Sequence, residues 1–202
     1  IAGAQEHGVY AYMKHFALND QEGNRNCMVA TWSNEQAIRE IYLKPFEMSV
    51  KDADCHAVMS SFNYIGNRWA GGCSELLQNV LRGEWGFLGF VETDYFGVYG
   101  YMTANQAVRN GGDLMLCTTG NDYNTVTVLT NSSKQAMRTS AKNILYTVVN
   151  SRAYEAENLN PGMAKWKVIL IGADVVAALL IVGLEYTAIK NYKKRKEEEE
   201  EV

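Results

Sequence analysis

An acid that directly follows a short apolar stretch is the strongest chemical signal in the sequence. Residues 86–97 read Gly-Phe-Leu-Gly-Phe-Val-Glu-Thr-Asp-Tyr-Phe-Gly, so Asp94 ends an expected strand and an aromatic, glycine-containing loop begins at Tyr95. Parallel α/β barrels carry their catalytic groups at the carboxyl ends of strands. A carboxylate there can attack a sugar carbon and hold it as a covalent ester. The same segment also fits an Asp that caps a helix at a βα turn.

Two other segments carry side chains suited to sugar chemistry. Lys14 and His15 come at the end of an expected strand and offer adjacent hydrogen-bond donors for sugar hydroxyls. The segment Met59-Ser60-Ser61-Phe62-Asn63 leaves a second expected strand and enters a loop. Asp113 begins a fourth expected strand, and we expect its role to be structural.

Glu92 is a second acid two residues before Asp94. Residues two apart on a strand face the same side, at a backbone separation of roughly 7 Å. Retaining glycosidases need two carboxyl groups about 5–5.5 Å apart on opposite sides of the bond to be cut. Glu92 is therefore disfavoured as the partner acid, and the alternative is a buried acid that raises the pKa of Asp94.

The elements that must position these residues alternate along the chain. Four short strands are expected, at 10–14, 57–61, up to 94 and at 113–117, and between and after them lie helices at 34–53, 75–82, 105–110 and 132–151. Ser33 or Asn34 is the expected N-cap of the first helix. The alternation predicts an α/β fold with parallel βα units and right-handed connections.

Composition excludes several kinds of partner. The 202 residues carry a net charge of −4, which argues against nucleic acid as a partner. Three histidines and four cysteines show neither CxxC nor HExxH spacing, so no metal and no cofactor are expected. The cysteines are expected to be small buried hydrophobic residues, and they are Cys27, Cys55, Cys73 and Cys117.

Residues 168–184 form an apolar run in which Asp174 is the single charge. Its Val, Ile and Leu residues favour membrane insertion by on the order of 5 kcal/mol in sum, which exceeds the roughly 2.5–3.5 kcal/mol cost of a central Asp. Trp166 and Tyr186 flank the run as expected interfacial anchors, which predicts a transmembrane helix over 166–186. The alternative is a buried core helix.

Charges beside the run predict its orientation. Five bases follow it within residues 190–196, and fewer precede it. The positive-inside rule then predicts a single-pass protein with a cytoplasmic C-terminus and residues 1–160 outside. The five glutamates at 197–201 are expected to be a solvated tail. Asp174 is either a functional intramembrane acid or a tolerated one, neutral by protonation.

Six segments in a fixed order carry a family resemblance. They are Lys14-His15-Phe16 with Asn19-Asp20-Gln21-Glu22; Arg39-Glu40-Ile41-Tyr42-Leu43 with Pro45-Phe46-Glu47; Met59-Ser60-Ser61-Phe62-Asn63; Leu81-Arg82 with Glu84-Trp85-Gly86-Phe87 and Gly89; Thr93-Asp94-Tyr95; and Gly112-Asp113-Leu114-Met115. Together they resemble glycoside hydrolase family 3, the β-glucosidase family, over roughly residues 1–155. The resemblance implies the second half of a (β/α)8 barrel, followed by a linker (156–165), the transmembrane helix (166–186) and a basic, then acidic tail (187–202).

The resemblance also implies roles for individual residues. Asp94 lies where the family keeps its nucleophile, and the substrate-binding residues would be Lys14, His15, Met59 and Tyr95. The implied reaction is hydrolysis of terminal β-glycosidic bonds in a β-glucoside or oligosaccharide, with retention of configuration. Two departures stand out, because the family often has Tyr where this chain has Phe62 and Trp where it has Tyr95.

Parts of the implied enzyme do not appear in this sequence. A (β/α)8 barrel takes about 250 residues, so the first strands, the acid/base and an accessory domain are expected upstream of Ile1 or in another domain. The chain is then the C-terminal piece of a longer protein, inactive by itself; a truncated gene is the alternative. Two other functions stay open: an inactive, sugar-binding or degenerate barrel fragment, and a membrane protein in which the span itself matters.

Overall fold

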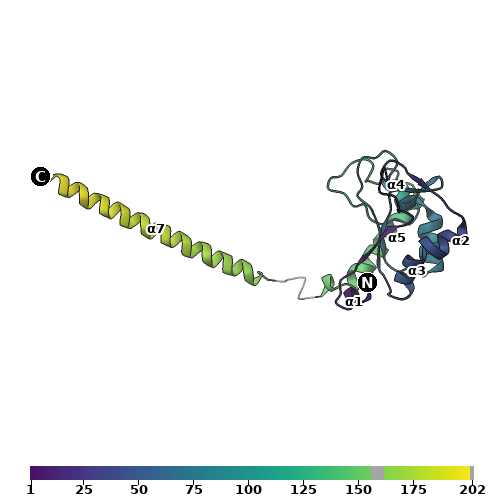
Figure 1. The fold of residues 1–202 in the computed structure, drawn as a ribbon, viewed down its shortest axis with the longest axis horizontal. Coiled ribbons are helices and arrows are strands. Elements are labelled where there is room, and N and C mark those ends of the chain that lie inside the picture. The colour runs from purple at the N-terminus through teal and green to yellow at the C-terminus, as the bar shows by residue number, and fades with distance from the viewer. Residues whose placement is uncertain (156–161, 201–202) are drawn as a thin grey trace. The chain divides into compact units, whose positions relative to one another are not determined.

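The computed structural model describes residues 1–155 and 162–200, with side chains as far as residue 196 in the last helix. It divides into two units, Ile1–Glu155 and Ala156–Val202 (Figure 1). The first unit contains, in chain order, α1 (Ala2–Gln5), β1 (Tyr12–Phe16), β2 (Ala30–Thr31), α2 (Glu35–Ala37), η1 (Ile38–Tyr42), α3 (Lys44–Lys51), β3 (Ala57–Ser60), β4 (Tyr64–Ile65), β5 (Arg68–Trp69), η2 (Ala70–Gly72), η3 (Glu75–Glu84), β6 (Phe90–Thr93), α4 (Ala104–Arg109), α5 (Asn131–Val149) and η4 (Arg152–Tyr154).

Three parallel strands form the main sheet, in the order β1-β3-β6. β3 and β6 pair without a break, and the last pair in register is Ser60 with Thr93. β1 begins two residues later than expected and its pairing with β3 is irregular between Met13 and Phe16. Because the strands are parallel, their carboxyl ends meet at one edge of the sheet. Parallel strands separated by helices confirm the α/β fold class.

The expected strand at 113–117 is wrong. Of this segment, Leu114 alone makes a parallel bridge, to Glu92. Farther along, the backbone N–H of Leu116 donates to the Thr93 side-chain oxygen at 3.2 Å. This side-chain oxygen stands where a strand would offer a backbone carbonyl, so the regular ladder does not continue.

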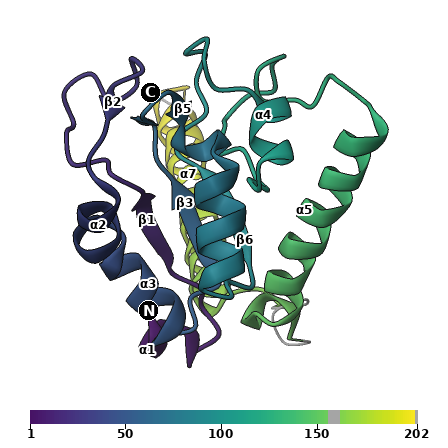
Figure 2. The same cartoon turned by 90° about the vertical axis from the view of Figure 1, so that its right-hand side faces the viewer.

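The core of the first unit lies against one face of the sheet, under helices α3 and η3 (Figure 2). Val58 and Val91 are register partners in neighbouring strands, and both are fully buried. Leu77 and Leu81, four residues apart on η3, join the same cluster. Each such side chain contributes about 1.5–3 kcal/mol on burial. A Cβ at Gly89 would lie 2.1 Å from a backbone oxygen just before β3, so glycine permits the close approach of β6.

The helices follow the sequence pattern with local changes. Asn34 is the N-cap, because its side-chain oxygen accepts a hydrogen bond from the Ala37 N–H at 2.8 Å. The single helix expected at 34–53 is divided into α2, the π-helical turn η1 and α3. The other three begin and end within two residues of their expected bounds, and η3 is π-helical throughout. Helix α5 lies beside β6 and away from β1 (Figure 2).

A second, small sheet was absent from the sequence-based expectations. Its order is β2-β4-β5, with β2 parallel to β4 and β4 antiparallel to β5. The β4–β5 hairpin turns at Gly66, whose φ of 61° lies in the left-handed region that glycine adopts without strain. Each strand has two residues, which is too short for an alternating pattern to be visible in the sequence.

The second unit contains the helix α7, Lys165–Glu200. By length and composition its segment Lys165–Lys196 is a candidate membrane span, with a mean hydropathy of 2.4 and no burial inside the protein over its most apolar window. An exposed apolar helix of this kind is contrary to the alternative of a buried core helix. The expected linker at 156–165 lies largely outside the described residues, as does the end of the acidic tail.

The cysteines agree with expectation in part. Cys55 and Cys73 are buried and serve as small hydrophobic residues, whereas Cys27 and Cys117 are exposed. All four are free thiols. Burial raises the pKa of both Cys55 and Cys73, which keeps these two thiols protonated at neutral pH.

Candidate active site

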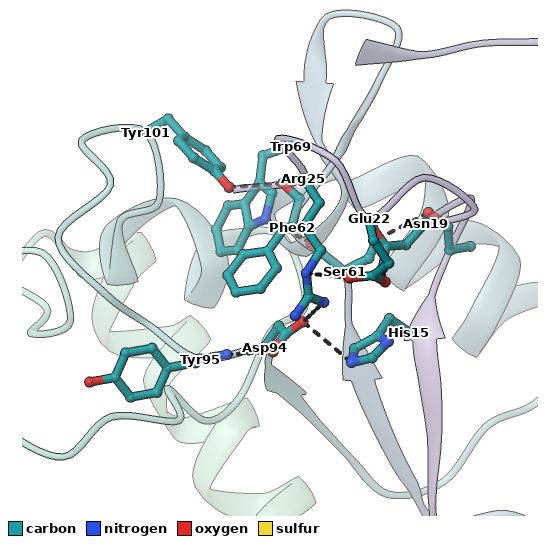
Figure 3. Close-up of polar contacts among 11 residues, drawn as sticks. His15, Asn19, Glu22, Arg25, Ser61, Phe62, Trp69, Asp94, Tyr95 and Tyr101 are labelled. Atoms are coloured by element: carbon teal, nitrogen blue, oxygen red, sulfur yellow. Dashed lines mark hydrogen bonds and ion pairs between the residues drawn. The ribbon is translucent and has the colours of Figure 1, made fainter. Parts of the chain in front are cut away.

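Asp94 follows the last residue of β6, at the edge where the parallel strands end (Figure 3). Its backbone N–H donates to the Ser60 carbonyl of β3 at 3.0 Å, which ties the loop to the neighbouring strand. One carboxylate oxygen, Oδ1, accepts the Tyr95 N–H at 2.7 Å. The other oxygen, Oδ2, faces His15 Nε2 at 3.3 Å and Arg25 Nη1 at 3.1 Å. Three donors from three segments therefore surround one nearly buried carboxylate.

His15 reaches Asp94 from β1, two strands away from β6. Burial lowers the pKa of His15; the Asp94 carboxylate works against this shift, and the charges of Lys14 and Arg25 add to it. With its pKa below the usual value of about 6.5, the ring is neutral at pH 7. A neutral imidazole that donates from Nε2 stabilises the ionised form of Asp94.

Arg25 is the residue that sequence reasoning did not single out. It lies in the β1–β2 loop, where Nη1 binds Asp94 and Nε binds Glu22 at 2.8 Å. Its guanidinium also lies over the Phe62 ring, with Cζ 4.8 Å from the ring centroid. An arginine three residues after Glu22 and ten after His15 was visible in the sequence. Its contact with β6, however, depends on how the loop folds back over the strand ends.

An aromatic cluster supports the loop side of the site. Phe62 and Trp69 are buried beside Tyr101 in one cluster (Figure 3). Trp69 Nε1 donates to the Ser61 carbonyl at 3.0 Å, and the Tyr101 hydroxyl donates to the Phe62 carbonyl at 3.0 Å. Burial raises the pKa of Tyr101, which keeps this donor protonated. These two bonds fix the backbone at the end of β3, directly beside Asp94.

The other residues predicted for the site lie around it at different depths. Lys14 is exposed, and Met59 is almost fully buried on β3. Tyr95 is 44% exposed, and its hydroxyl lies 3.1 Å from the Thr118 hydroxyl. The structure thus brings His15 into direct contact with the Asp94 carboxylate and Tyr95 into contact through its backbone. The contacts described for Lys14 and Met59 do not include that carboxylate.

Glu92 and Asp113 are acids outside the group around Asp94. Burial raises the pKa of Glu92, whose side-chain partner is the Tyr12 hydroxyl. Asp113 accepts hydrogen bonds from Arg82 Nη2 at 2.7 Å, from the Val91 N–H at 2.8 Å and from an Asn143 amide at 3.0 Å. These contacts tie together η3, β6 and α5, which is the structural role expected for Asp113.

The arrangement determines what the site can do. A carboxylate held by an arginine and a histidine is ionised and oriented, as a nucleophile must be. It also lies at the strand-to-loop edge, where ligands of parallel α/β proteins bind. Within the residues that the structure describes, no three or more His, Cys, Asp or Glu side chains gather as a metal site would require.

The parallel strands and the acid at their carboxyl ends place the chain among α/β proteins with a polar site at one sheet edge. Comparison with known families makes this specific. The chain belongs to the family described as "Glycosyl hydrolase family 3 N terminal domain", which matches residues 1–145.

Curated relatives resemble part of the chain. A probable β-glucosidase K of Emericella nidulans is 41% identical over 114 residues, which is 56% of this chain and 13% of that protein. A β-glucosidase of Rhizobium radiobacter is 42% identical over 114 residues, with the same shares. The chain therefore spans 13% of the length of these relatives.

Solved structures of the same kind share the fold. β-Glucosidase 3B from Thermotoga neapolitana, in complex with glucose, has 31% identity and a TM-score of 0.65, over 78% of this chain and 23% of that one. A β-D-glucoside glucohydrolase from Trichoderma reesei has 29% identity and a TM-score of 0.67, over 77% of this chain and 22% of that one.

Proposed function

We propose that this chain carries the nucleophile of a retaining, β-glucosidase-like glycoside hydrolase. The observation that supports the proposal most is the Asp94 carboxylate, contacted by His15 and Arg25 at the carboxyl end of β6. Family membership and the β-glucosidase names of the relatives agree with this chemistry.

In the proposed reaction an Asp94 oxygen attacks the anomeric carbon of a terminal β-glucoside. The bond from that carbon to the leaving oxygen breaks, and the leaving oxygen takes a proton from a separate acid. Water, deprotonated by the same group, then cleaves the ester and returns the Asp94 carboxylate with the anomeric configuration retained. His15 and Arg25 hold the carboxylate ionised before the attack and accept it back after hydrolysis.

Four side chains are proposed to bind the sugar. Lys14 and His15 would donate hydrogen bonds to hydroxyl groups, and Met59 would contact the ring from β3. Tyr95 is proposed as an aromatic platform, and its partial exposure agrees with that role.

We further propose that residues 1–155 are about half of a (β/α)8 barrel within a longer polypeptide. The parallel order β1-β3-β6 and the relatives' greater length agree with this arrangement. The remaining strands, the acid/base and an accessory domain would then come from the rest of that polypeptide. The chain alone would be inactive, because a half barrel leaves sheet edges unpaired.

Residues 166–186 are proposed to anchor the protein in a membrane, with the catalytic part outside and the C-terminus in the cytoplasm. The length, hydropathy and exposure of α7 support a span, and the bases at 190–196 support this orientation. Extraction of membranes at alkaline pH should leave the protein in the pellet. Protease added to intact cells should remove residues 1–155 and spare the C-terminus; the reverse pattern would contradict the orientation.

The activity is tested by hydrolysis of an aryl β-glucoside by the full-length polypeptide that contains this chain. Asp94→Ala should lower kcat/KM by at least about 10⁴-fold, because the covalent step loses its nucleophile. Asp122→Ala, at an exposed acid in a loop, is the matched control and should hydrolyse normally. Equal turnover by the Asp94→Ala variant and the parent would reject the proposal.

A second candidate is a protein that binds sugar without cleaving it. Phe62 favours this reading, since a phenylalanine against the site cannot donate a hydrogen bond to Asp94. Saturable binding of cellobiose by the full-length polypeptide, with no hydrolysis after prolonged incubation, would select this candidate over the first.

A further inference from the structure

A second pocket lies along the same β1–β2 loop that carries Arg25 to Asp94. Its volume is about 320 Å³, near the lower limit of the roughly 300–1,000 Å³ typical of ligand pockets. Residues from the loop, from the end of β2 and from η1 line it, chiefly Asp20, Gln21, Trp32, Ser33 and Tyr42.

Trp32 is the most unusual side chain of this pocket. It is 86% exposed, although indole is among the most costly side chains to leave in water. The backbone on both sides of it is fixed: Thr31 donates to the Tyr64 carbonyl at 2.8 Å and accepts from an Asn63 amide at 2.9 Å. Asn34, two residues later, caps α2. The indole is therefore presented on a rigid support, which lowers the entropic cost of binding a ligand.

The polar groups of the pocket suit hydroxyl-rich ligands. Asp20 is an exposed carboxylate that can accept hydrogen bonds from two hydroxyls. Gln21 uses its amide nitrogen on the Gly23 carbonyl at 3.0 Å, so its carbonyl oxygen is left to accept another bond. Ser33 adds a neutral donor, and the half-exposed Tyr42 adds a second aromatic ring. A pyranose ring has an apolar face for the indole and hydroxyls at its rim for these groups, whereas the Asp20 charge repels phosphates and other anions.

Contacts connect the pocket to the candidate nucleophile. Asn19 and Glu22, on either side of Asp20 and Gln21, hydrogen-bond to each other at 3.3 Å. Glu22 in turn holds Arg25, which holds Asp94. A ligand that orders this loop would also order the arginine that contacts the carboxylate.

We propose that the Trp32 pocket is an accessory saccharide-binding site, which stacks a pyranose ring on the indole and binds its hydroxyls through Asp20 and Gln21. The choice of ligand class rests on the proposed function, but the site is separate from the group around Asp94. It would hold a second sugar unit of an oligosaccharide, or a free saccharide, and steady the β1–β2 loop.

The test uses the full chain in detergent and the fluorescence of Trp32. A Trp166→Phe background removes the other exposed tryptophan, because Trp69 and Trp85 are buried. Cellobiose should shield Trp32 from acrylamide quenching by at least twofold. Two results would overturn the proposal: quenching that cellobiose leaves unchanged, or an indole already shielded before sugar is added, since another protein surface would then cover it.

Binding measured by saturation-transfer NMR supplies the second readout. Trp32→Ala and Asp20→Ala should each weaken cellobiose binding about tenfold, which corresponds to about 1.4 kcal/mol. Trp166→Ala, the same substitution at an exposed tryptophan outside the pocket, should leave binding unchanged. Equal binding by the Trp32→Ala variant, or binding of tetramethylammonium in preference to cellobiose, would reject a saccharide site.

Failure of this proposal can be told apart from failure of the proposed function. Shielding of Trp32 without hydrolysis by the full-length polypeptide would remove the catalytic role of Asp94 and keep the pocket. Hydrolysis without shielding would remove the pocket and keep the nucleophile.

Discussion

Asp94 and Asp113 are two buried acids, each paired with an arginine, yet they are built for different tasks. The Asp94 side chain is 10% exposed and lies 3.1 Å from Arg25, which itself comes from a loop and is 29% exposed. The Asp113 side chain is 2% exposed and lies 2.7 Å from Arg82, which is 20% exposed. Asp113 also binds the backbone of β6 and an amide of α5.

The difference lies in which part of the protein each carboxylate contacts. Asp113 joins three regular elements and directs its oxygens into the protein. Asp94 stands at the strand-to-loop edge, held by side chains that a loop and a strand end supply. The first pair stabilises the fold, whereas the second orients a reactive group and can be rearranged when a substrate arrives.

Removal of the Asp113 carboxylate should have the largest effect on stability. Asp113→Ala leaves Arg82 buried without its partner, so the free energy of unfolding should fall by about 3–5 kcal/mol. Asp113→Asn keeps hydrogen-bonding atoms in place and should cost less. Urea unfolding followed by circular dichroism measures both. Asp94→Ala should change stability by less than about 1 kcal/mol, since Arg25 keeps Glu22 and water as partners; equal losses at the two acids would erase the distinction.

Arg25 should matter for rate more than for folding. Arg25→Lys keeps a positive charge but loses the geometry in which one guanidinium holds both Asp94 and Glu22. We expect kcat to fall by about 10²-fold, as when one oriented donor is lost from a reacting charge. Arg109→Lys, at an arginine at the end of α4, is the control. A rate within twofold of the parent would mean that Arg25 does not orient the nucleophile.

Phe62 should limit the rate by a smaller factor. Phe62→Tyr would place a hydroxyl beside Asp94, and one added hydrogen bond of about 0.5–1.5 kcal/mol predicts up to a tenfold rise in kcat. Steady-state kinetics on an aryl β-glucoside would measure it, with Phe96→Tyr as the matched control in the same aromatic cluster. A fall in rate without a loss of stability would show that the site does not admit the hydroxyl.

The smallest effect concerns pH. The pKa of His15 is lowered in the folded state, so between that lowered value and about 6.5 the unfolded chain binds more protons than the folded chain. The stability that neutral His15 contributes is complete above pH about 6.5 and is lost as pH falls through the folded-state pKa. Unfolding measured from pH 7.5 to 5 should decline more steeply for the parent than for His15→Gln. Parallel curves would contradict a neutral His15 beside Asp94.

The same comparison explains what the sequence could and could not predict. Asp94 was visible because an apolar run bounded by glycines ends at it, and β6 indeed ends one residue before it. The strand expected from Asp113 failed because side chains of β6 and of Asp113 itself take over the backbone contacts of that segment. Local periodicity predicts apolar strands well, but it does not reveal where polar side chains replace the ladder.

Arg25 and the small sheet were missed for another reason. Both depend on how the segment between β1 and β3 folds back over the strand ends, and no short-range pattern encodes that path. The loop contains few apolar residues, and the strands of the small sheet have two residues each. Trp32 is a similar case: its type was visible in the sequence, but its exposure on a rigid support was not.

The nucleophile is tested most directly by trapping the covalent intermediate. The full-length polypeptide would be incubated with a fluorinated, mechanism-based β-glucoside, digested and analysed by mass spectrometry. Our account predicts one added fluoroglucosyl group on the Asp94 side chain, and none after Asp94→Asn. Labelling of Glu92 or of any other side chain, with Asp94 unmodified, would contradict it.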